Sequence, residues 1–92
     1  MKYTIEMAPR AAKAFKKLSQ KAQRVIRDII YSLADEPMPD GAIPLTNRKN
    51  IIRYRKGDYR IVYTIKKKEL VVLVLKVGDR KDVYRNIMKL KY

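Results

Sequence analysis

The chain has 92 residues, with 23 Lys or Arg against 9 Asp or Glu, and a formal net charge of +14. It contains no Cys and no His, which excludes disulfides, a thiolate nucleophile, a zinc–thiolate site and a histidine base. One domain over residues 1–92 is expected in the cytoplasm, because no apolar run could span a membrane and the first residues lack a signal-peptide core.

The first half of the chain predicts a short strand and two helices. Apolar and polar residues alternate over residues 2–7, as in a half-buried strand. Pro9 suits the first turn of a helix. Ser19 is placed to cap a longer helix, which must end by Glu36 because Pro37 disfavours helical geometry in the residue before it. The two helices are expected to form a hairpin with one shared apolar side.

The second half predicts three strands and a last helix, after a stretch of ambiguous pattern at residues 42–49. The predicted strands, joined by tight turns, are residues 51–55, 59–66 and 70–77. Gly78 breaks the last strand, and residues 82–90 have the apolar spacing of a helix. The predicted fold is α+β with the order β-α-α-β-β-β-α, in which an antiparallel sheet packs on the helical hairpin and a short helix ends the chain.

Strand alternation divides the predicted sheet into an apolar face and a mixed face. The apolar face, expected to pack on the helices, consists of Ile52, Tyr54, Tyr59, Ile61, Tyr63, Ile65, Val71, Leu73, Leu75 and Val77. The opposite face carries cations at one end, namely Arg53, Arg55, Arg60 and Lys76. Its other end carries Val62, Val72 and Val74, which Val83 and Ile87 of the last helix are expected to cover.

The basic end of this face predicts a binding site for an anion. Like charges that face each other across strands are mutually unfavourable, so the arrangement favours a negatively charged occupant. Arginine offers planar paired donors that match a phosphate group. With the net charge of +14, the expected partners are nucleic acid, an acidic protein or both, and not a membrane surface. The acidic residues show no D-x-D or E-x-x-E pair, so we expect no metal and no cofactor.

Tyrosine is the enriched aromatic type, with seven residues against one Phe and no Trp. Most of the strand tyrosines fall on the apolar face and are expected to pack in the core with a hydrogen-bonded hydroxyl. Tyr84 differs, because it lies close in sequence to Arg80 and Lys81. Two roles stay open for its ring, stacking on an unpaired base or ordinary packing within the last helix.

Two short motifs resemble those of the RelE/ParE toxin–antitoxin superfamily, in its RelE branch. Residues 57–63, Gly-Asp-Tyr-Arg-Ile-Val-Tyr, are similar to the family's G-x-Y-R-hydrophobic-hydrophobic-Y strand. Residues 77–84, Val-Gly-Asp-Arg-Lys-Asp-Val-Tyr, are similar to its V-G-x-R…V-Y turn into the last helix. The resemblance spans nearly the whole chain, and the predicted order of elements agrees with it.

The resemblance implies an endoribonuclease that cuts messenger RNA in the ribosomal A site, by attack of a 2′-hydroxyl on the adjacent phosphate. It implies catalytic roles for Arg60, Arg80 and Tyr84. RNA-binding roles are expected for the surrounding cations Arg53, Arg55, Lys56, Lys76 and Lys81. The family often has lysines where this chain has Arg53 and Arg55, and arginine is a poor proton acceptor, so the general base stays unidentified.

The implied partners are the ribosome, its mRNA and a cognate antitoxin that is acidic and partly disordered. Toxin and antitoxin are expected to form a hetero-oligomer that binds operator DNA through the antitoxin. Two other functions stay open from the sequence. A ParE-like inhibitor of DNA gyrase would share the fold without needing the set of Arg60, Arg80 and Tyr84. A non-catalytic RNA-binding module would bind RNA with a steep dependence on salt and would not be toxic.

Overall fold

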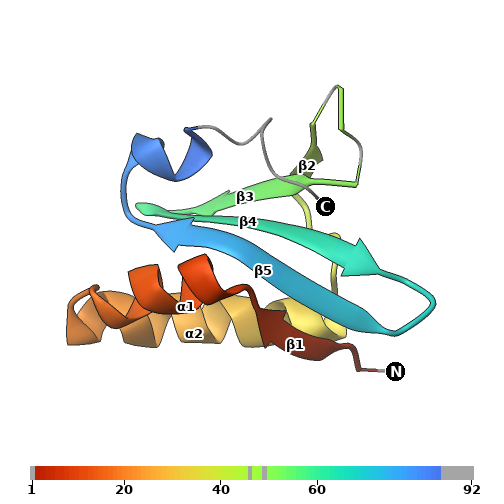
Figure 1. Cartoon of the computed structure of the whole chain (residues 1–92), viewed down its shortest axis with the longest axis horizontal. Coiled ribbons are helices and arrows are strands. Elements are labelled where there is room, and N and C mark those ends of the chain that lie inside the picture. The colour runs from red at the N-terminus through yellow and green to blue at the C-terminus, as the bar shows by residue number, and fades with distance from the viewer. Residues whose placement is uncertain (1, 46, 49, 86–92) are drawn as a thin grey trace.

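In the computed structural model, which describes residues 2–45, 47–48 and 50–85, a five-stranded sheet packs on two helices (Figure 1). The elements are β1 (Thr4–Met7), α1 (Pro9–Lys16), α2 (Gln20–Asp35), β2 (Ile43–Pro44), β3 (Ile52–Lys56), β4 (Tyr59–Lys66), β5 (Val71–Gly78) and a 3₁₀ turn, η1 (Lys81–Tyr84). The strand order across the sheet is β1-β5-β4-β3-β2. Within these residues, no helix has the length and apolar character that a membrane crossing requires.

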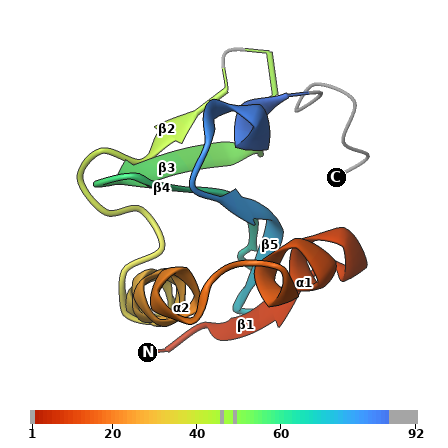
Figure 2. The same ribbon diagram turned by 90° about the vertical axis from the view of Figure 1, so that its left-hand side faces the viewer.

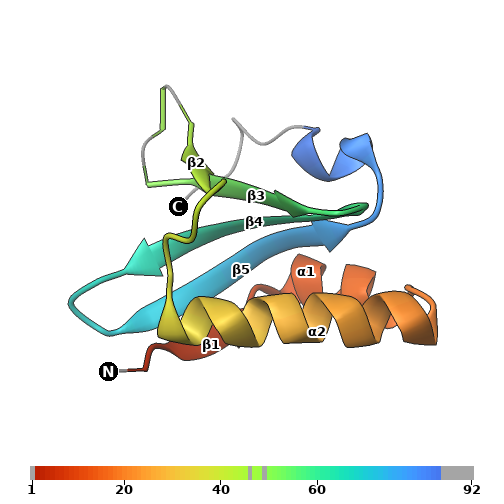
Figure 3. The same ribbon diagram turned by 180° about the vertical axis from the view of Figure 1, so that it is seen from behind.

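The two helices form the predicted hairpin and begin where the sequence indicates. Pro9 stands in the first turn of α1, and the Ser19 hydroxyl caps α2 by accepting a hydrogen bond from the Ala22 N–H at 3.1 Å. α2 ends at Asp35, two residues before Pro37. Both helices lie on one side of the sheet, and α2 runs along most of its length (Figure 2 and Figure 3). The apolar stripe that α2 buries consists of Ile26, Ile29, Ile30 and Leu33.

A bulge in β5 shifts the alternation of its side chains partway along the strand. Across the ladder between β4 and β5, Val62 pairs with Lys76, but the next residue, Tyr63, pairs with Val74. Leu75 is therefore an extra residue between the two pairs, and the side chains before it and after it alternate in different phase.

Because of this bulge, the predicted faces of β5 are wrong over residues 71–75. Three residues that were predicted to face the helices lie instead in an apolar cluster on the other side of the sheet, namely Val71, Leu73 and Leu75. Val72 and Val74, predicted for that other side, pack against the helices. Beyond the bulge the prediction is confirmed for Val77, which packs on the helix side.

Three other parts of the predicted fold are corrected. The sheet is mixed, because β1 pairs in parallel with β5; alternation identifies a strand but not its direction. A further strand, β2, lies in the stretch at residues 42–49 and pairs with β3. Where the last helix was predicted to begin, the structure has the tight turn η1. The remainder of the predicted helix, with Ile87, lies outside the described residues.

Gly78 provides the space in which η1 seats on the sheet. A Cβ atom at Gly78 would lie 2.5 Å from Cγ2 of Val83, closer than side chains tolerate. Val83 is buried in the cluster on the outer face, with Val62 and Leu75. The position of η1, and of Tyr84 at its end, therefore depends on the missing side chain at residue 78.

Tyr63 joins the sheet to the loop that follows α2. Its side chain is fully buried, and its hydroxyl donates a hydrogen bond to the Pro37 carbonyl at 2.6 Å. Burial, with Tyr54 nearby, raises the pKa of the Tyr63 hydroxyl well above its ordinary value, so the group stays a protonated donor. The predicted packing role with a hydrogen-bonded hydroxyl is confirmed for this residue.

Replacing Tyr63 with Phe keeps the ring but leaves the Pro37 carbonyl without this donor. We expect Tyr63→Phe to lower the free energy of unfolding by about 1–2 kcal/mol, measured by urea denaturation. Tyr31→Phe is the matched control, because the Tyr31 side chain is 61% exposed and should change little. Equal stabilities of the two variants would contradict the role given to the hydrogen bond.

The close contact between Gly78 and Val83 predicts that a substitution at one position compensates for a substitution at the other. Gly78→Ala should lower the free energy of unfolding by about 1–3 kcal/mol, because the added methyl group collides with Val83. The same substitution should cost much less in a Val83→Ala background, where the colliding methyl groups are absent. Urea denaturation of the two single variants and the double variant measures this coupling. Additive losses would show that the contact does not position the turn.

Candidate functional site

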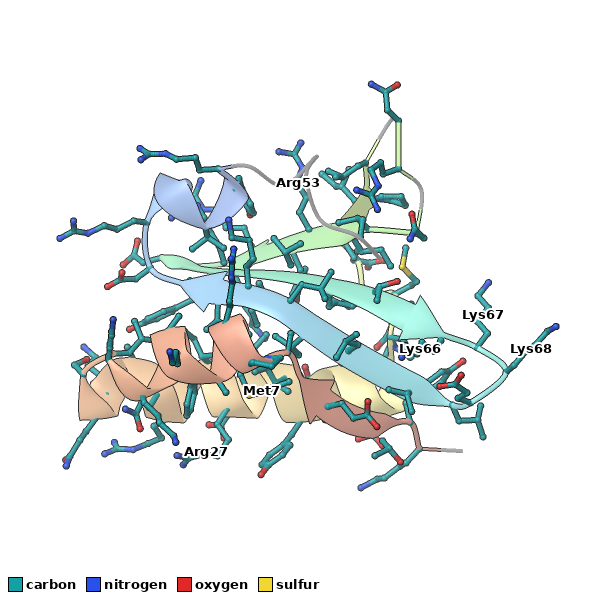
Figure 4. The ribbon with its side chains drawn as sticks, in the orientation of Figure 1. Met7, Arg27, Arg53, Lys66, Lys67 and Lys68 are labelled. Carbon is teal, nitrogen blue, oxygen red and sulfur yellow. The ribbon has the colours of Figure 1, made fainter. Side chains whose placement is uncertain are left out.

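A groove of about 370 Å³ opens on the face of the sheet that points away from the helices. Its walls come from the start of β2, from β3 and β4, and from η1. The lining residues are Gly41, Ile43, Arg53, Arg55, Arg60 and Tyr84. Figure 4 shows Arg53 rising from β3 on this side. Three of the four strand cations predicted for one face therefore meet in one groove, together with the tyrosine.

Tyr84 lies over two of the groove arginines. Its ring centroid is 5.7 Å from Cζ of Arg53 and 6.0 Å from Cζ of Arg60. The negative face of an aromatic ring attracts a guanidinium group, so Tyr84 offsets part of the repulsion between the two cations. The ring also packs against the apolar cluster on the outer face. Of the two roles left open for Tyr84, apolar packing is seen here, and stacking on an unpaired base stays a prediction.

The arginines differ in how firmly the protein holds them. Arg60 is only 7% exposed, on the central strand β4, whereas Arg53 and Arg55 are exposed. Arg55 pairs directly with Arg60 across the ladder between β3 and β4. The Nε atom of Arg55 donates to the carbonyl of Gly57 at 3.1 Å, which holds that side chain toward the turn. Arg60 is therefore the fixed cation of the groove.

Among the side chains that the structure describes, no carboxylate neutralises the groove. The carboxylate of Asp35 pairs with Lys2, at 3.9 Å, outside the groove, and none of the described lining residues is Asp or Glu. The same residues include no group of three His, Cys, Asp or Glu side chains placed to hold a metal ion. The groove thus offers guanidinium donors and an aromatic ring, a combination that could hold an anion with a planar or aromatic part.

Arg80, Lys76 and Lys56, which were also predicted for the site, do not line this groove. Arg80 and Lys76 line a second hollow, of about 260 Å³, together with Val83 of η1. Lys56 lies on the helix side, in a hollow that it shares with Asp28 of α2. Lys81 is the first residue of η1, and its side chain lies outside the described part of the structure. Of the three residues predicted to be catalytic, the structure brings Arg60 and Tyr84 together, whereas Arg80 lines the second hollow.

Lys76 feels the charges of other cations as well as that of Arg80 in its hollow. Its Nζ atom donates a hydrogen bond to the backbone carbonyl of Arg85. Burial, together with the nearby charges of Arg10 and Arg85, lowers the pKa of the Lys76 ammonium group. Sequence reasoning missed Arg10, because α1 gave only the pattern of a helix that packs on the sheet.

Sequence reasoning also missed two residues that line the groove near β2, Gly41 and Ile43. Gly41 adopts a φ of +92° just before β2, a conformation that glycine tolerates best. Ile43 follows it and is 48% exposed, although it is a large apolar residue. The two residues fall in or next to the stretch whose pattern was ambiguous, and a two-residue strand is too short to show alternation.

Comparisons with known proteins agree on one family. A family model described as the ParE toxin of type II toxin–antitoxin systems, parDE, matches residues 5–84. Toxin RelG of Mycobacterium tuberculosis is 27% identical over 86 residues, which cover 92% of this chain and 99% of that protein. The RelE–RelB complex of the archaeon Pyrococcus horikoshii OT3 is similar in structure, with a TM-score of 0.74 and 28% identity over 88% of this chain and 98% of that one.

A second similar structure is the toxin–antitoxin complex RelBE2 of Mycobacterium tuberculosis, with a TM-score of 0.79 and 24% identity over 87% of this chain and 100% of that one. The family match includes both motifs and every strand that lines the groove. The resemblance found in the sequence is thereby confirmed, and the chain belongs to the RelE/ParE superfamily of toxins from type II toxin–antitoxin systems.

Proposed function

We propose that this toxin is a ribosome-dependent mRNA endoribonuclease, which inhibits translation by cutting messenger RNA. The observation that carries the proposal is the groove in which Arg53, Arg60 and Tyr84 meet without a neutralising carboxylate among the described side chains. Relatives named RelE and RelG toxins, similar over nearly the whole chain, support the RelE branch.

The arginines supply the charge that a phosphodiester under attack requires. Negative charge grows on the non-bridging oxygens as the phosphorus becomes five-coordinate, and fixed guanidinium donors stabilise it. Arg60 suits this task because burial in the groove floor fixes its position. Arg53, which is exposed at the rim, contacts the phosphate from the other side. Loss of one such donor usually costs about 10²–10³ in rate.

The reaction needs no added water. The ribose 2′-oxygen forms a bond to the phosphorus of the adjacent phosphate, and the bond from phosphorus to the 5′-oxygen breaks. The 2′-hydroxyl loses its proton and the departing 5′-oxygen gains one, which leaves a 2′,3′-cyclic phosphate and a free 5′-hydroxyl. Stacking of a base on Tyr84 would hold the attacking oxygen in line with the leaving oxygen.

In this proposal, positioning of the RNA strand contributes more to the cleavage rate than proton transfer does. The groove lining includes neither a lysine nor a carboxylate among the described residues, and arginine is a poor proton acceptor. Arg80 would act on the strand from the adjoining hollow, on the other side of η1. A ribosome that presents the strand already splayed would provide the geometry that a small groove cannot impose alone.

The same charges explain why such a toxin would need an acidic partner. Two of the similar structures are complexes of a toxin with its antitoxin. We extend this to the present chain, whose net charge of +14 favours an acidic antitoxin segment that folds on binding. A second candidate function is inhibition of DNA gyrase, which the name of the matching ParE family model favours.

The proposal predicts that cleavage depends on individual groove residues. With translating ribosomes and primer extension as the readout, the wild-type protein should cut mRNA in the A site. Arg60→Ala should slow cleavage by about 10²–10³-fold, because the fixed donor is lost. Tyr84→Ala should slow it more than Tyr84→Phe, since Phe keeps the stacking surface. Arg24→Ala, an exposed cation on α2, is the control and should leave the rate nearly unchanged.

Three results would contradict this proposal. Inhibition of gyrase supercoiling without any A-site cut would favour the ParE type of activity. Salt-dependent RNA binding with neither activity would favour a binding module. Equal losses for Arg60→Ala and Arg24→Ala would show that net charge matters and the groove does not.

A further inference from the structure

A hollow of about 410 Å³ opens where the loop after α2 meets the edge strand β2 and the turn between β4 and β5. Figure 3 shows this loop rising from the end of α2 to β2, at the end of the sheet that carries the turn. The edge hollow, as we call it, is lined by Met38, Pro44, Asn50, Ile52, Ile65 and Lys67. Ile52 and Ile65 belong to the core on the helix side, so the edge hollow lies on the opposite side of the sheet from the groove.

Most of the lining of the edge hollow is apolar, and part of it is exposed. Met38, on the loop after α2, is a large apolar residue that is 46% exposed. Ile52 is buried and Ile65 is partly buried, so apolar surface continues from the exposed rim into the core. None of the described lining residues is acidic. Exposed apolar side chains around a concavity are typical of a site that receives an apolar group of a partner.

Three consecutive lysines, Lys66, Lys67 and Lys68, occupy the end of β4 and the turn beside the edge hollow. Two backbone hydrogen bonds close this turn, from the Glu69 N–H to the Lys66 carbonyl at 3.2 Å and from the Leu70 N–H to the Lys67 carbonyl at 3.3 Å. In Figure 4, Lys67 and Lys68 extend outward from the turn. The backbone therefore holds the lysines at one corner of the molecule, where Lys67 lines the edge hollow.

No carboxylate among the described side chains neutralises these lysines. Glu69 follows them in the turn but forms no ion pair with them within the described part of the chain. Neighbouring like charges raise the free energy of the empty site, which a bound anion would lower. Charge alone would suit RNA phosphates as well as carboxylates. The apolar lining favours a protein segment, because an aliphatic side chain gains free energy from burial against Met38 and Ile65 and a phosphate does not.

We propose that the edge hollow is a docking site for an acidic segment of the antitoxin, which inserts one aliphatic side chain beside Met38 and sets its carboxylates against Lys67 and Lys68. This inference rests on the acidic partner proposed above, and it adds the surface of the toxin on which one segment of that partner binds. Because the edge hollow and the groove lie on opposite sides of the sheet, a segment bound here leaves the groove open.

Binding of a short synthetic peptide, in which glutamates flank a single central leucine, tests the charged part of the site. Fluorescence anisotropy should show that this leucine peptide binds the toxin. The double variant Lys67→Gln/Lys68→Gln should weaken its binding about fivefold, because two partners of the carboxylates are lost. Lys16→Gln/Lys17→Gln is the matched control, since it removes the same charge from two consecutive exposed lysines at the end of α1, and it should change the affinity less than about twofold.

The apolar part of the site is tested with a second peptide, in which serine replaces the leucine. This serine peptide should bind the wild-type toxin about tenfold more weakly, because no aliphatic side chain is buried. Met38→Ser should weaken binding of the leucine peptide and leave that of the serine peptide nearly unchanged. Tyr31→Ser is the control, because Tyr31 is an exposed residue of α2 that does not line the edge hollow. In methyl NMR spectra, the leucine peptide should shift the signals of Ile52 and Ile65.

Three results would overturn the inference. The first is a leucine peptide that does not bind, or that binds without shifting these methyl signals. The second is equal weakening by the two pairs of lysine substitutions, which would reduce the effect to net charge. The third is a Lys67→Gln/Lys68→Gln variant that binds a 2′-O-methyl RNA strand more weakly but the peptide as before, which would assign the lysines to RNA.

The result is separable from that of the proposed function, because the peptide and the mRNA occupy opposite sides of the sheet. A toxin that binds the leucine peptide as expected but cuts no ribosome-bound mRNA would contradict the proposed endoribonuclease and leave the docking site in place. A toxin that cuts mRNA in the A site but does not bind the peptide would contradict the docking site alone.

Discussion

Guanidinium groups on neighbouring strands repel one another, and the sheet gives them no way to move apart. The ladder between β3 and β4 fixes Arg55 opposite Arg60, and alternation places Arg53 on the same face. The Tyr84 ring offsets part of the repulsion between Arg53 and Arg60. The free energy that holds the cations together comes from the backbone and the two apolar clusters. An anion therefore meets donors that are already assembled, which is the arrangement that favours charge stabilisation in a transition state.

The bulge at Leu75 makes this arrangement compatible with a packed core. Val72 and Val74 face the helices, so regular alternation would turn Lys76 into the same apolar layer. A buried ammonium group without a partner is costly, and the extra residue turns Lys76 to the outer face, opposite Val62. The same irregularity lets β5 contribute to both apolar clusters and to the basic surface, and it allows Val77 to return to the helix side.

Sequence patterns predicted the parts of the fold in which polar and apolar residues differ clearly. The cap at Ser19 and the alternation of β4 are confirmed, and so is the common face of the β3 and β4 arginines. The phase of β5 was hidden because residues 71–75 are all apolar, so either face could be the core. Lys56 was predicted to bind RNA beside these arginines, but it is the last residue of β3 and lies on the helix side instead. Arg80 lies apart from Tyr84 because the residues between them enter the tight turn η1. The spacing of the two residues along the chain does not reveal this turn.

We propose that Arg53, Arg55 and Arg60 are assembled to bind a phosphate beneath Tyr84. NMR of the arginine side chains tests this role most directly, with Nε–Hε signals followed during titration with a 2′-O-methyl RNA strand. We expect the largest shifts at Arg53 and Arg60, with slowed exchange of their Hε protons and a concurrent shift of the Tyr84 ring signals. Uniform small shifts over all exposed arginines, with Arg60 unchanged, would show that RNA is attracted only by net charge and would contradict this role of the groove.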